Sequence, residues 1–307
     1  MHEIKRVVII GLGALGIMYG HFFEKKLGKE NVLFLANSER VQRYQKSVFK
    51  FNNEVCHFQY ACPENIPFQA DLLMFAVKGG ALKDAIELAK SVVSDQTTII
   101  SVLNGISSEE IISNGLDKGH VIPCFAQKMD ALKEGCNVTS KTFGELCIGL
   151  LPNSRHDEPF LHNLMNFFDS IGFSYQHKKD IRHGIWCKWM LNVGVNQVLM
   201  VENGTFDDIQ KSGPKRERML SAMREVLELS KLEGVFLTEE DFDQYVNIID
   251  HLNSDGMPSM RQDRLARRAS EVELFSGTVI RKAKQFGLLV PTNLALYEEV
   301  KQIESTY

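Results

Sequence analysis

The sequence of 307 residues predicts an α/β domain followed by an all-helical domain. In the first half, short runs of aliphatic and β-branched residues alternate with helical stretches, which is typical of a parallel sheet built from βαβ units. A cluster of glycines directly follows the first of these runs. From about Lys179 onward, apolar residues recur with helical spacing. We therefore expect the first domain to span residues 1–178 and the second to span residues 179–307.

The elements expected in the first domain follow from these runs. Alternation of polar and apolar residues over 51–61 and 138–151 favours antiparallel or edge strands. Residues 151–159 then read as a loop, followed by a helix near 159–170 and a short strand at 173–176. Continuous apolar runs predict the buried parallel strands, at residues 6–10, 32–36, 72–77, 97–103 and 120–125. In the second domain, periodicity predicts helices at residues 180–200, 214–233, 238–252, 258–268, 271–286 and 293–304.

Composition narrows the class of function. The chain is 44% hydrophobic and 24% charged, which is ordinary for a globular protein that buries a core. Lys plus Arg total 35 against 39 for Asp plus Glu, a net charge of −4, which argues against nucleic acid as the main partner, leaves a local basic patch open and favours metabolite chemistry. The uncharged run at 7–19 is too short to span a bilayer and is broken by glycines, so we expect neither export nor membrane insertion.

The six cysteines are scattered along the chain and include no C-x-x-C pair. We recognise no zinc-ligand pattern of Cys and His among them, so the sequence predicts no metal site. Unpaired cysteines of this kind are typical of reduced thiols, and we expect a cytoplasmic protein.

The motif GLGALG (11–16) matches G-x-G-x-x-G directly after a predicted strand and at the start of a predicted helix. In this motif Gly11 permits a tight turn, Gly13 lets backbone N–H groups approach a pyrophosphate, and Gly16 permits close helix packing. Ala14 and Leu15 complete the loop whose N–H groups face the anion. The motif predicts a Rossmann-type dinucleotide site, the alternative being a tight glycine turn that binds nothing.

The end of the second strand indicates which dinucleotide is bound, because an Asp or Glu there would hold a ribose 2′-hydroxyl and repel a 2′-phosphate. The sequence has Asn37 and Ser38 at this position, and Arg40 follows. These residues favour NADP, while Glu39 leaves NAD open.

Two further polar residues follow predicted strands, where ligands bind in an open α/β sheet. Lys78 lies in FAVKGG and Asn104 in VLNGIS. Either residue could instead cap the helix that follows it. Their occurrence after neighbouring strands favours a shared site.

The helical half carries a polar stripe in WCKWMLNVGVNQ (186–197). Lys188, Asn192 and Asn196 are spaced four residues apart within an otherwise apolar segment, so they share one face of a helix. An exposed stripe is the alternative, although Asn is a poor helix former and Glu, Gln or Lys would be commoner there.

Further polar residues occur in 258–287. Ser259 opens one predicted helix, and Glu271 and Glu273 follow Ser270 at the start of the next, where a capping role is the simplest explanation for Glu271. The arginines between them favour a solvated face, with one of them available to an anionic substrate: Arg261, Arg264, Arg267 and Arg268.

Taken together, these segments resemble the ketopantoate reductase (2-dehydropantoate 2-reductase) family over nearly the whole chain. The resemblance rests on the opening G-x-G-A-L-G, the V-K pair ending at Lys78, the V-L-N-G turn, the K-x-x-x-N-x-x-x-N helix, the S-M-x-Q-D segment and the acidic pair near 271. It implies a Rossmann domain that binds NADPH, a helical domain, and a substrate in the cleft between them. The expected reaction is reduction of ketopantoate to pantoate, in pantothenate and coenzyme A biosynthesis.

The resemblance also assigns roles to residues. Lys188 is implied as the catalytic acid with Glu271 as a second catalytic residue, and Asn104, Asn192, Asn196 and Ser259 as substrate-binding residues. The implied cofactor-binding residues are Gly11, Gly13, Ala14, Leu15, Gly16, Asn37, Arg40, Lys78 and Asn104.

The sequence also departs from the family pattern. Asn37 stands where many members have Arg, which keeps NAD open as cofactor, and the usual T-E-I-D reads S-E-V-E at 270–273. The residues 124–135 also differ from the family pattern. Three alternatives therefore stand beside the expected reaction. The first is a related dehydrogenase that acts on another 2-oxo acid, on a 3-hydroxy acid or on a sugar phosphate. The second is a non-catalytic NAD(P) sensor, and the third is an adaptor protein. The expected partner is a small 2-oxo acid, and the chain is expected to be a monomer or homodimer.

Overall fold

The computed structural model describes residues 3–307, which divide into two compact units. The first unit comprises residues up to Leu103 and Ser107–Ile181, and the second comprises Asn104–Ile106 and Arg182–Tyr307. Asn104 therefore belongs by its contacts to the helical unit, although it follows a strand of the first unit. None of the helices within residues 3–307 combines the length and apolar character needed to cross a membrane.

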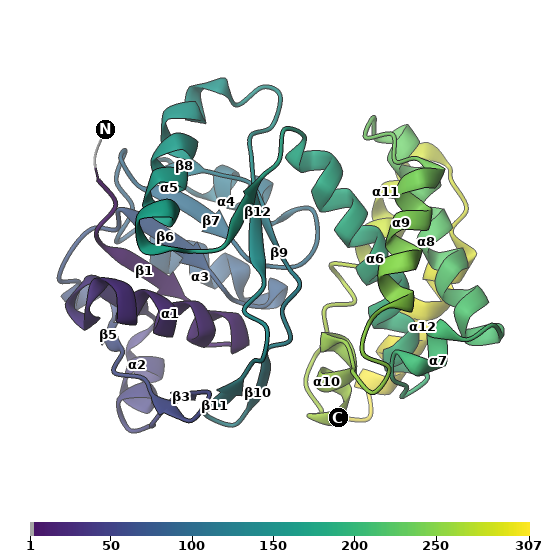
Figure 1. The fold of residues 1–307 in the computed structure, drawn as a ribbon, viewed down its shortest axis with the longest axis horizontal. Coiled ribbons are helices and arrows are strands. Elements are labelled where there is room, and N and C mark those ends of the chain that lie inside the picture. Colours follow the sequence, from purple (N-terminus) through teal and green to yellow (C-terminus); the bar gives the residue numbers. More distant parts are fainter. Residues whose placement is uncertain (1–2) are drawn as a thin grey trace. The chain divides into compact units, whose positions relative to one another are not determined.

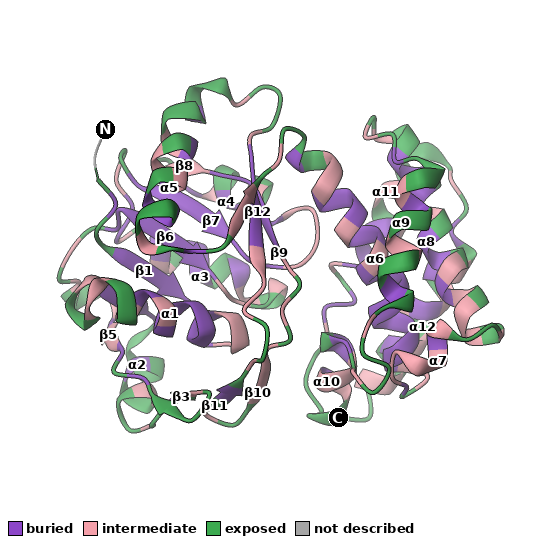
Figure 2. Ribbon diagram, viewed as in Figure 1, coloured by how far each residue is buried: buried purple, intermediate pink, exposed green. Residues whose placement is uncertain are grey.

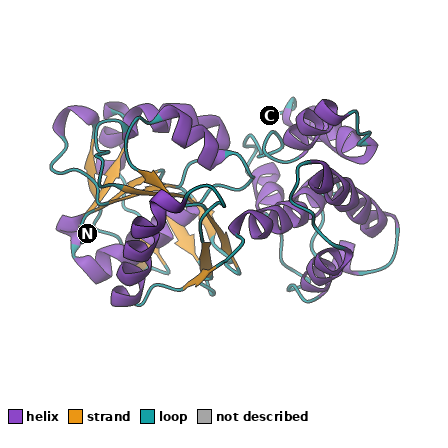
Figure 3. Cartoon of the chain, turned by 90° about the horizontal axis from the view of Figure 1, so that it is seen from above, coloured by secondary structure: helices purple, strands orange, loops and turns teal. Residues whose placement is uncertain are grey.

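A six-stranded parallel sheet forms the centre of the first unit (Figure 1). Its strand order is β5-β2-β1-β6-β7-β8, so the order reverses at β1, which pairs with β2 on one side and β6 on the other. Helices lie on both faces of this sheet (Figure 3). The strands are β1 (Val7–Ile10), β2 (Val32–Leu35), β5 (Gln59–Ala61), β6 (Leu72–Phe75), β7 (Thr98–Ser101) and β8 (His120–Val121), and the helices are α1 (Ala14–Leu27), α2 (Ser38–Gln45), α3 (Leu82–Ala89), α4 (Ser108–Gly115) and α5 (Glu158–Ile171).

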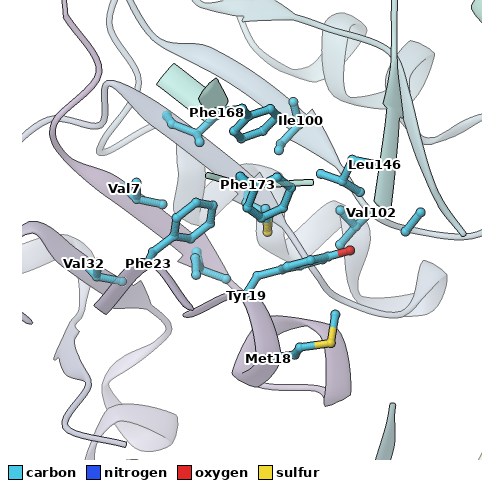
Figure 4. Close-up of a cluster of buried hydrophobic side chains, with 14 of the residues drawn as sticks. Val7, Met18, Tyr19, Phe23, Val32, Ile100, Val102, Leu146, Phe168 and Phe173 are labelled. Carbon is cyan, nitrogen blue, oxygen red and sulfur yellow. The ribbon is translucent and has the colours of Figure 1, made fainter. Parts of the chain in front are cut away.

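All four residues of β1 are buried because both faces of the sheet are covered (Figure 2). Val7 and Ile9 join one apolar core, whereas Val8 and Ile10 join another on the opposite face, as the two-residue period of a strand requires. The first core contains a cluster of aromatic rings, in which Phe173 stacks on Phe168 with ring centroids 4.4 Å apart (Figure 4).

Two smaller sheets complete the first unit. The predicted strand at 120–125 is wrong as a single strand, because Pro123 separates β8 from β9, and β9 pairs antiparallel with β12 in another sheet. Proline has no backbone N–H to continue a ladder. Asn52 and Asn53, both at positive φ, form the tight turn between β3 and β4. The strands of these sheets are β3 (Lys50–Phe51), β4 (Glu54–Val55), β9 (Cys124–Gln127), β10 (Leu132–Glu134), β11 (Asn137–Thr139), β12 (Glu145–Ile148) and β13 (Tyr175–His177).

The second unit is helical and is organised around one apolar core (Figures 1 and 2). The long helix α6 contributes many of its buried residues, including Trp186 and Trp189, which pack edge to face. The helices are α6 (Ile181–Val201), α7 (Asp207–Gln210), α8 (Pro214–Leu232), α9 (Glu239–Asp250), α10 (Ser259–Leu265), α11 (Ser276–Phe286) and α12 (Pro291–Glu304).

Candidate active site

The glycine loop joins β1 to α1 at the point where the strand order reverses, which is where open α/β sheets bind ligands. Gly11 has φ +115°, and a Cβ there would lie 2.3 Å from the carbonyl oxygen of Ala76. A Cβ on Gly16 would lie 2.0 Å from the carbonyl oxygen of Gly11. The fold itself therefore requires glycine at both positions.

Gly13 differs from the other two glycines of the loop. A Cβ at Gly13 would meet only the carbonyl oxygen of Ala76, at the ordinary contact distance of 3.6 Å, and its φ is −81°. Gly13 is also the N-cap of α1, and no side chain in the described chain caps this helix end. The N–H groups of Ala14 and Leu15 lie in the first turn, where helices favour anions. The loop therefore fits a pyrophosphate, for which the space beside Gly13 remains open.

The end of β2 carries the residues expected near the ribose. Asn37 is the N-cap of α2, and its Oδ1 accepts a hydrogen bond from the backbone N–H of Arg40 at 2.9 Å. Both side chains are exposed. Asn37 thus has a structural role at the helix start.

Lys78 lies three residues beyond the end of β6, the strand next to β1. The backbone N–H of Ala76 donates to the carbonyl oxygen of Ile10 at 2.8 Å, which holds the end of β6 beside the start of the glycine loop. The exposed Lys78 occupies the N-cap position of a short 3₁₀ turn (η3, Gly79–Ala81), but its side chain makes no capping hydrogen bond there. A side-chain capping role for Lys78 is therefore not observed within residues 3–307.

Asn104 pairs with an acidic residue of the helical unit. Its Nδ2 donates to Oε2 of Glu271 at 2.9 Å, across 167 positions of sequence. The N-cap of α4 is Ser107, so the expected alternative of a helix cap at Asn104 is wrong.

Glu271 does not open a helix, because α11 begins at Ser276 and its N-cap is Phe275. Residues 271–275 form a turn in which the N–H of Leu274 donates to the carbonyl oxygen of Glu271 at 2.9 Å. Trp189 Nε1 donates to the carbonyl oxygen of Leu274 at 2.9 Å and so ties this turn to α6. The predicted helix start at 271 and the capping explanation for Glu271 are therefore wrong. Its side chain is only 8% exposed, and a buried carboxylate requires polar partners.

The polar stripe of α6 is not a solvent-exposed stripe. Asn192 is 8% exposed and Asn196 is 4% exposed, while Lys188 is half-buried. Asn196 Oδ1 accepts from Ser259 Oγ at 3.0 Å and from the backbone N–H of Met260 at 3.2 Å, and Asn196 Nδ2 donates to Asn192 Oδ1 at 3.2 Å. The expected alternative of an exposed stripe is therefore wrong for its two asparagines.

The backbone N–H of Met260 fixes the orientation of both amide groups. A backbone N–H can only donate, so the Asn196 atom beside it must be the acceptor Oδ1, and Nδ2 must face Asn192. The Asn192 atom that meets this donor is then Oδ1. Asn192 Nδ2 has no hydrogen-bond partner among residues 3–307 and is available as a donor to a ligand.

The four arginines near α10 have separate roles. Arg264 donates to the carbonyl oxygens of Met200 and Val201 at 2.5 and 2.7 Å, at the C-terminal end of α6. Arg267 donates to a backbone carbonyl, and Arg268 pairs with Asp263 at 3.2 Å.

Arg261 differs from these three residues. Its Nε and Nη1 atoms are buried without a hydrogen-bond partner in the described part of the chain. Burial, followed by the charge of Arg264, lowers the pKa of Arg261. An anion would supply the partner that this guanidinium lacks.

The structure therefore brings the predicted residues together in two groups. In the first unit, the glycine loop and Lys78 share the carboxyl edge of the sheet, and Asn37 and Arg40 follow the neighbouring strand. In the second unit, hydrogen bonds connect Asn192, Asn196 and Ser259, and a separate hydrogen bond joins Asn104 to Glu271. A third cluster, which no sequence motif predicted, consists of His183, Cys187 and Asp241. The four-residue spacing of His183 and Cys187 on α6 was the available signal.

Comparison with known families covers both units. Residues 7–153 match the family described as Ketopantoate reductase PanE/ApbA, and residues 180–304 match Ketopantoate reductase PanE/ApbA C terminal. The chain belongs to the ketopantoate reductase family. It is an oxidoreductase of that family, and its mixed α/β fold with a helical C-terminal region is the ketopantoate reductase fold.

Relatives named for more than one activity share this fold. A 2-dehydropantoate 2-reductase of Aquifex aeolicus (strain VF5) is 24% identical over 309 residues, covering 98% of this chain and 97% of the relative. A D-mandelate dehydrogenase solved with NADH and anilino(oxo)acetate is 21% identical with a TM-score of 0.87, covering 98% of this chain and 99% of that one. A dimeric ketopantoate reductase from Staphylococcus aureus is 19% identical with a TM-score of 0.79, at 98% and 99% coverage.

Proposed function

We propose that this ketopantoate reductase family member reduces 2-dehydropantoate (ketopantoate) to (R)-pantoate with NADPH, in pantothenate and coenzyme A biosynthesis. The observation that carries the proposal is the hydrogen-bonded series from Ser259 through Asn196 to Asn192, on the helix of Lys188. This series leaves one oriented amide donor, Asn192 Nδ2, on the face that also carries a cationic acid. A 2-oxo acid has a carbonyl and a carboxylate, which such donors recognise.

The reduction needs a hydride and a proton. A nicotinamide bound through the glycine loop supplies the hydride. In our proposal the Lys188 ammonium donates the proton to the carbonyl oxygen as negative charge develops there. Asn192 Nδ2 holds an oxygen of the substrate, and Ser259 supports it through Asn196.

Glu271 and Arg261 complete the proposed site. Glu271 is held by Asn104 at 2.9 Å, and we assign it to orienting the substrate and the Lys188 ammonium. Arg261 is the arginine of α10 whose buried nitrogens lack a partner within residues 3–307, and we assign it to the substrate carboxylate. Charge-assisted hydrogen bonds of this kind are about twice as strong as neutral ones.

For the cofactor, we propose NADPH bound by Gly11, Gly13, Ala14, Leu15 and Gly16. No carboxylate stands directly at the end of β2, and Asn37, Ser38 and Arg40 are exposed there. Lys78, beside the loop, adds a positive charge for the phosphates. NAD is the alternative cofactor, because Glu39 directly follows Ser38 and its carboxylate could hold the ribose 2′-hydroxyl of NAD.

A second candidate is a dehydrogenase of other 2-oxo acids that uses NADH. The specific observation in its favour is that a D-mandelate dehydrogenase solved with NADH and anilino(oxo)acetate shares this fold, with a TM-score of 0.87.

Initial rates distinguish the two candidates. Oxidation of NADPH and of NADH is followed by absorbance with ketopantoate, then with aromatic and branched 2-oxo acids. We expect the highest kcat/KM for ketopantoate with NADPH. A higher kcat/KM for an aromatic 2-oxo acid with NADH would support the second candidate and contradict the first. Arg40→Ala should lower kcat/KM for NADPH more than for NADH, whereas Arg43→Ala, an exposed arginine on the same helix, should leave the ratio unchanged.

A further inference from the structure

A cluster of three potential metal ligands lies between α6 and α9 in the helical unit. His183 and Cys187 are four residues apart on α6 and therefore share a face, and Asp241 lies in the first turn of α9. His183 Nδ1 and Cys187 Sγ are 3.7 Å apart, and His183 Nε2 is 3.0 Å from Asp241 Oδ2. One ligand atom from each residue lies within 4.8 Å of the other two.

The separations and atom types fit a tetrahedral cation. With bonds of about 2.3 Å to sulfur and about 2.1 Å to nitrogen, two ligands on one zinc ion lie about 3.5 Å apart. The observed Sγ to Nδ1 distance of 3.7 Å is close to that value. Asp241 Oδ2 faces the other ring nitrogen, Nε2, at 3.0 Å, and an imidazole offers only one nitrogen to a given ion, so this pair opens when Asp241 ligates. Thiolate, imidazole and carboxylate together select a borderline-soft divalent ion and disfavour magnesium or calcium, which prefer oxygen ligands alone.

We infer that His183, Cys187 and Asp241 bind a divalent cation of the zinc class and thereby join α6 to α9. Cys187 binds as a thiolate and releases its proton to solvent, because the thiolate is the form that ligates metal. The thiolate and carboxylate together balance the charge of the ion. Water takes the fourth position, as in sites with three protein ligands.

The affinity of this site for an ion depends on how exposed its ligands are and on the hydrogen bonds that the ion must replace. Cys187 is 2% exposed, but the side chains of His183 and Asp241 are 32% and 17% exposed, so an ion approaches from their side. Without an ion, Asp241 Oδ2 accepts hydrogen bonds from Thr238 N and Oγ1, both at 2.8 Å, in the capping box of α9. Metal binding competes with these contacts and with the His183 pair, so we expect an exchangeable ion.

Cobalt(II) is the probe, because its bond to a thiolate gives a charge-transfer absorption that other ligands do not produce. Full-length protein treated with chelator is titrated with Co²⁺ and then with Zn²⁺. We expect one equivalent of Co²⁺ to give this absorption and Zn²⁺ to remove it. Melting of the protein is followed in parallel, and bound Zn²⁺ should raise the melting temperature, because an ion that binds only the folded state stabilises it.

Three variants and one control decide the assignment. Cys187→Ser and His183→Gln should abolish the absorption, and Asp241→Asn, which can still accept the capping bonds, should weaken Co²⁺ binding on the order of tenfold or more. Cys62→Ser, a half-buried thiol of the first unit, should change nothing. Absence of the band in the wild type, its survival in Cys187→Ser, its loss in Cys62→Ser, or unchanged affinity in Asp241→Asn would each overturn the site. If Cys187→Ser fails to fold, the Co²⁺ affinity of Asp241→Asn decides whether the site exists: weaker binding supports it, and unchanged binding contradicts it.

Discussion

Lys188 is half-buried on the helical face that also carries two buried asparagines. If it donates the proton in the proposed reduction, Lys188→Ala should lower kcat by about 10² to 10⁴, the usual contribution of a positioned acid. NADPH affinity, measured by fluorescence titration, should remain near that of the wild type. Turnover within a few-fold of the wild type would instead assign the proton to Lys78 or water, and loss of NADPH binding would place Lys188 at the cofactor.

Asn196 is expected to act through Asn192, because both of its amide atoms are already bonded within the protein. Asn196→Asp keeps acceptors for Ser259 and Met260 but loses the donor that orients Asn192. We expect kcat/KM to fall by about tenfold to a hundredfold, equivalent to ~1–3 kcal/mol for one unsatisfied polar group. In a double-mutant cycle, adding Asn196→Asp to Asn192→Ala should cost little more than Asn192→Ala alone. Additive effects would show that Asn196 contacts the substrate directly.

Two buried nitrogens of Arg261 have no hydrogen-bond partner in residues 3–307, which makes this guanidinium a candidate for binding the substrate carboxylate. Arg261→Gln should raise KM for the oxo acid about tenfold or more, since hydrogen bonds to charged groups contribute ~1.5–3 kcal/mol, with a smaller effect on NADPH. Arg267→Gln serves as the matched control, because Arg267 is exposed and bonded to the carbonyl oxygen of Thr306. Equal effects of the two substitutions on KM would remove Arg261 from the substrate site.

At the scale of elements, the β1 to α1 connection separates structural from ligand-binding glycines. Gly13→Ala should leave the melting temperature unchanged, because its Cβ meets only Ala76 at 3.6 Å. It should nevertheless weaken NADPH binding about tenfold or more, ~1.4 kcal/mol, by filling the space beside the pyrophosphate. Gly16→Ala should instead destabilise the fold, because its Cβ would lie 2.0 Å from the carbonyl oxygen of Gly11. Wild-type NADPH affinity in folded Gly13→Ala would show that the loop does not bind the cofactor.

At the scale of the whole molecule, the two units should respond differently to acid. His21 on α1 is 7% exposed, and burial lowers its pKa, while Glu54 at 3.4 Å partly opposes the shift. The unfolded chain therefore takes up this proton first as pH falls below about 6.5, so the free energy of unfolding decreases until the folded-state pKa is reached. We expect the first unit to lose stability across this range, and His21→Gln to remove that loss.

Hydrogen exchange of the backbone amides in β1 and α1, corrected for intrinsic exchange rates, measures the stability of the first unit at each pH. Both tryptophans, Trp186 and Trp189, belong to the second unit, so their fluorescence follows that unit separately. His57→Gln changes an exposed histidine and should preserve the wild-type pH dependence. If the first unit of His21→Gln loses stability with falling pH as the wild type does, groups other than His21 cause that loss.

Local sequence patterns determined much of this protein. The parallel strands, the glycine loop and the four-residue polar stripe were predictable because each depends on the period of one strand or helix, which the backbone geometry sets. The residues of that stripe lie on α6 as expected.

Tertiary packing decided what the local pattern left open. Pro123 ends one strand, but only the packing of the first unit places β9 in a different sheet from β8. Glu271 opens a turn and no helix, and two segments distant in sequence hold this turn: Trp189 donates to the carbonyl oxygen of Leu274, and Asn104 donates to the carboxylate of Glu271. The roles of Asn192 and Asn196 likewise depend on a single backbone N–H of α10. Such hydrogen bonds form between groups that only the folded chain brings together, so no period along the sequence could encode them.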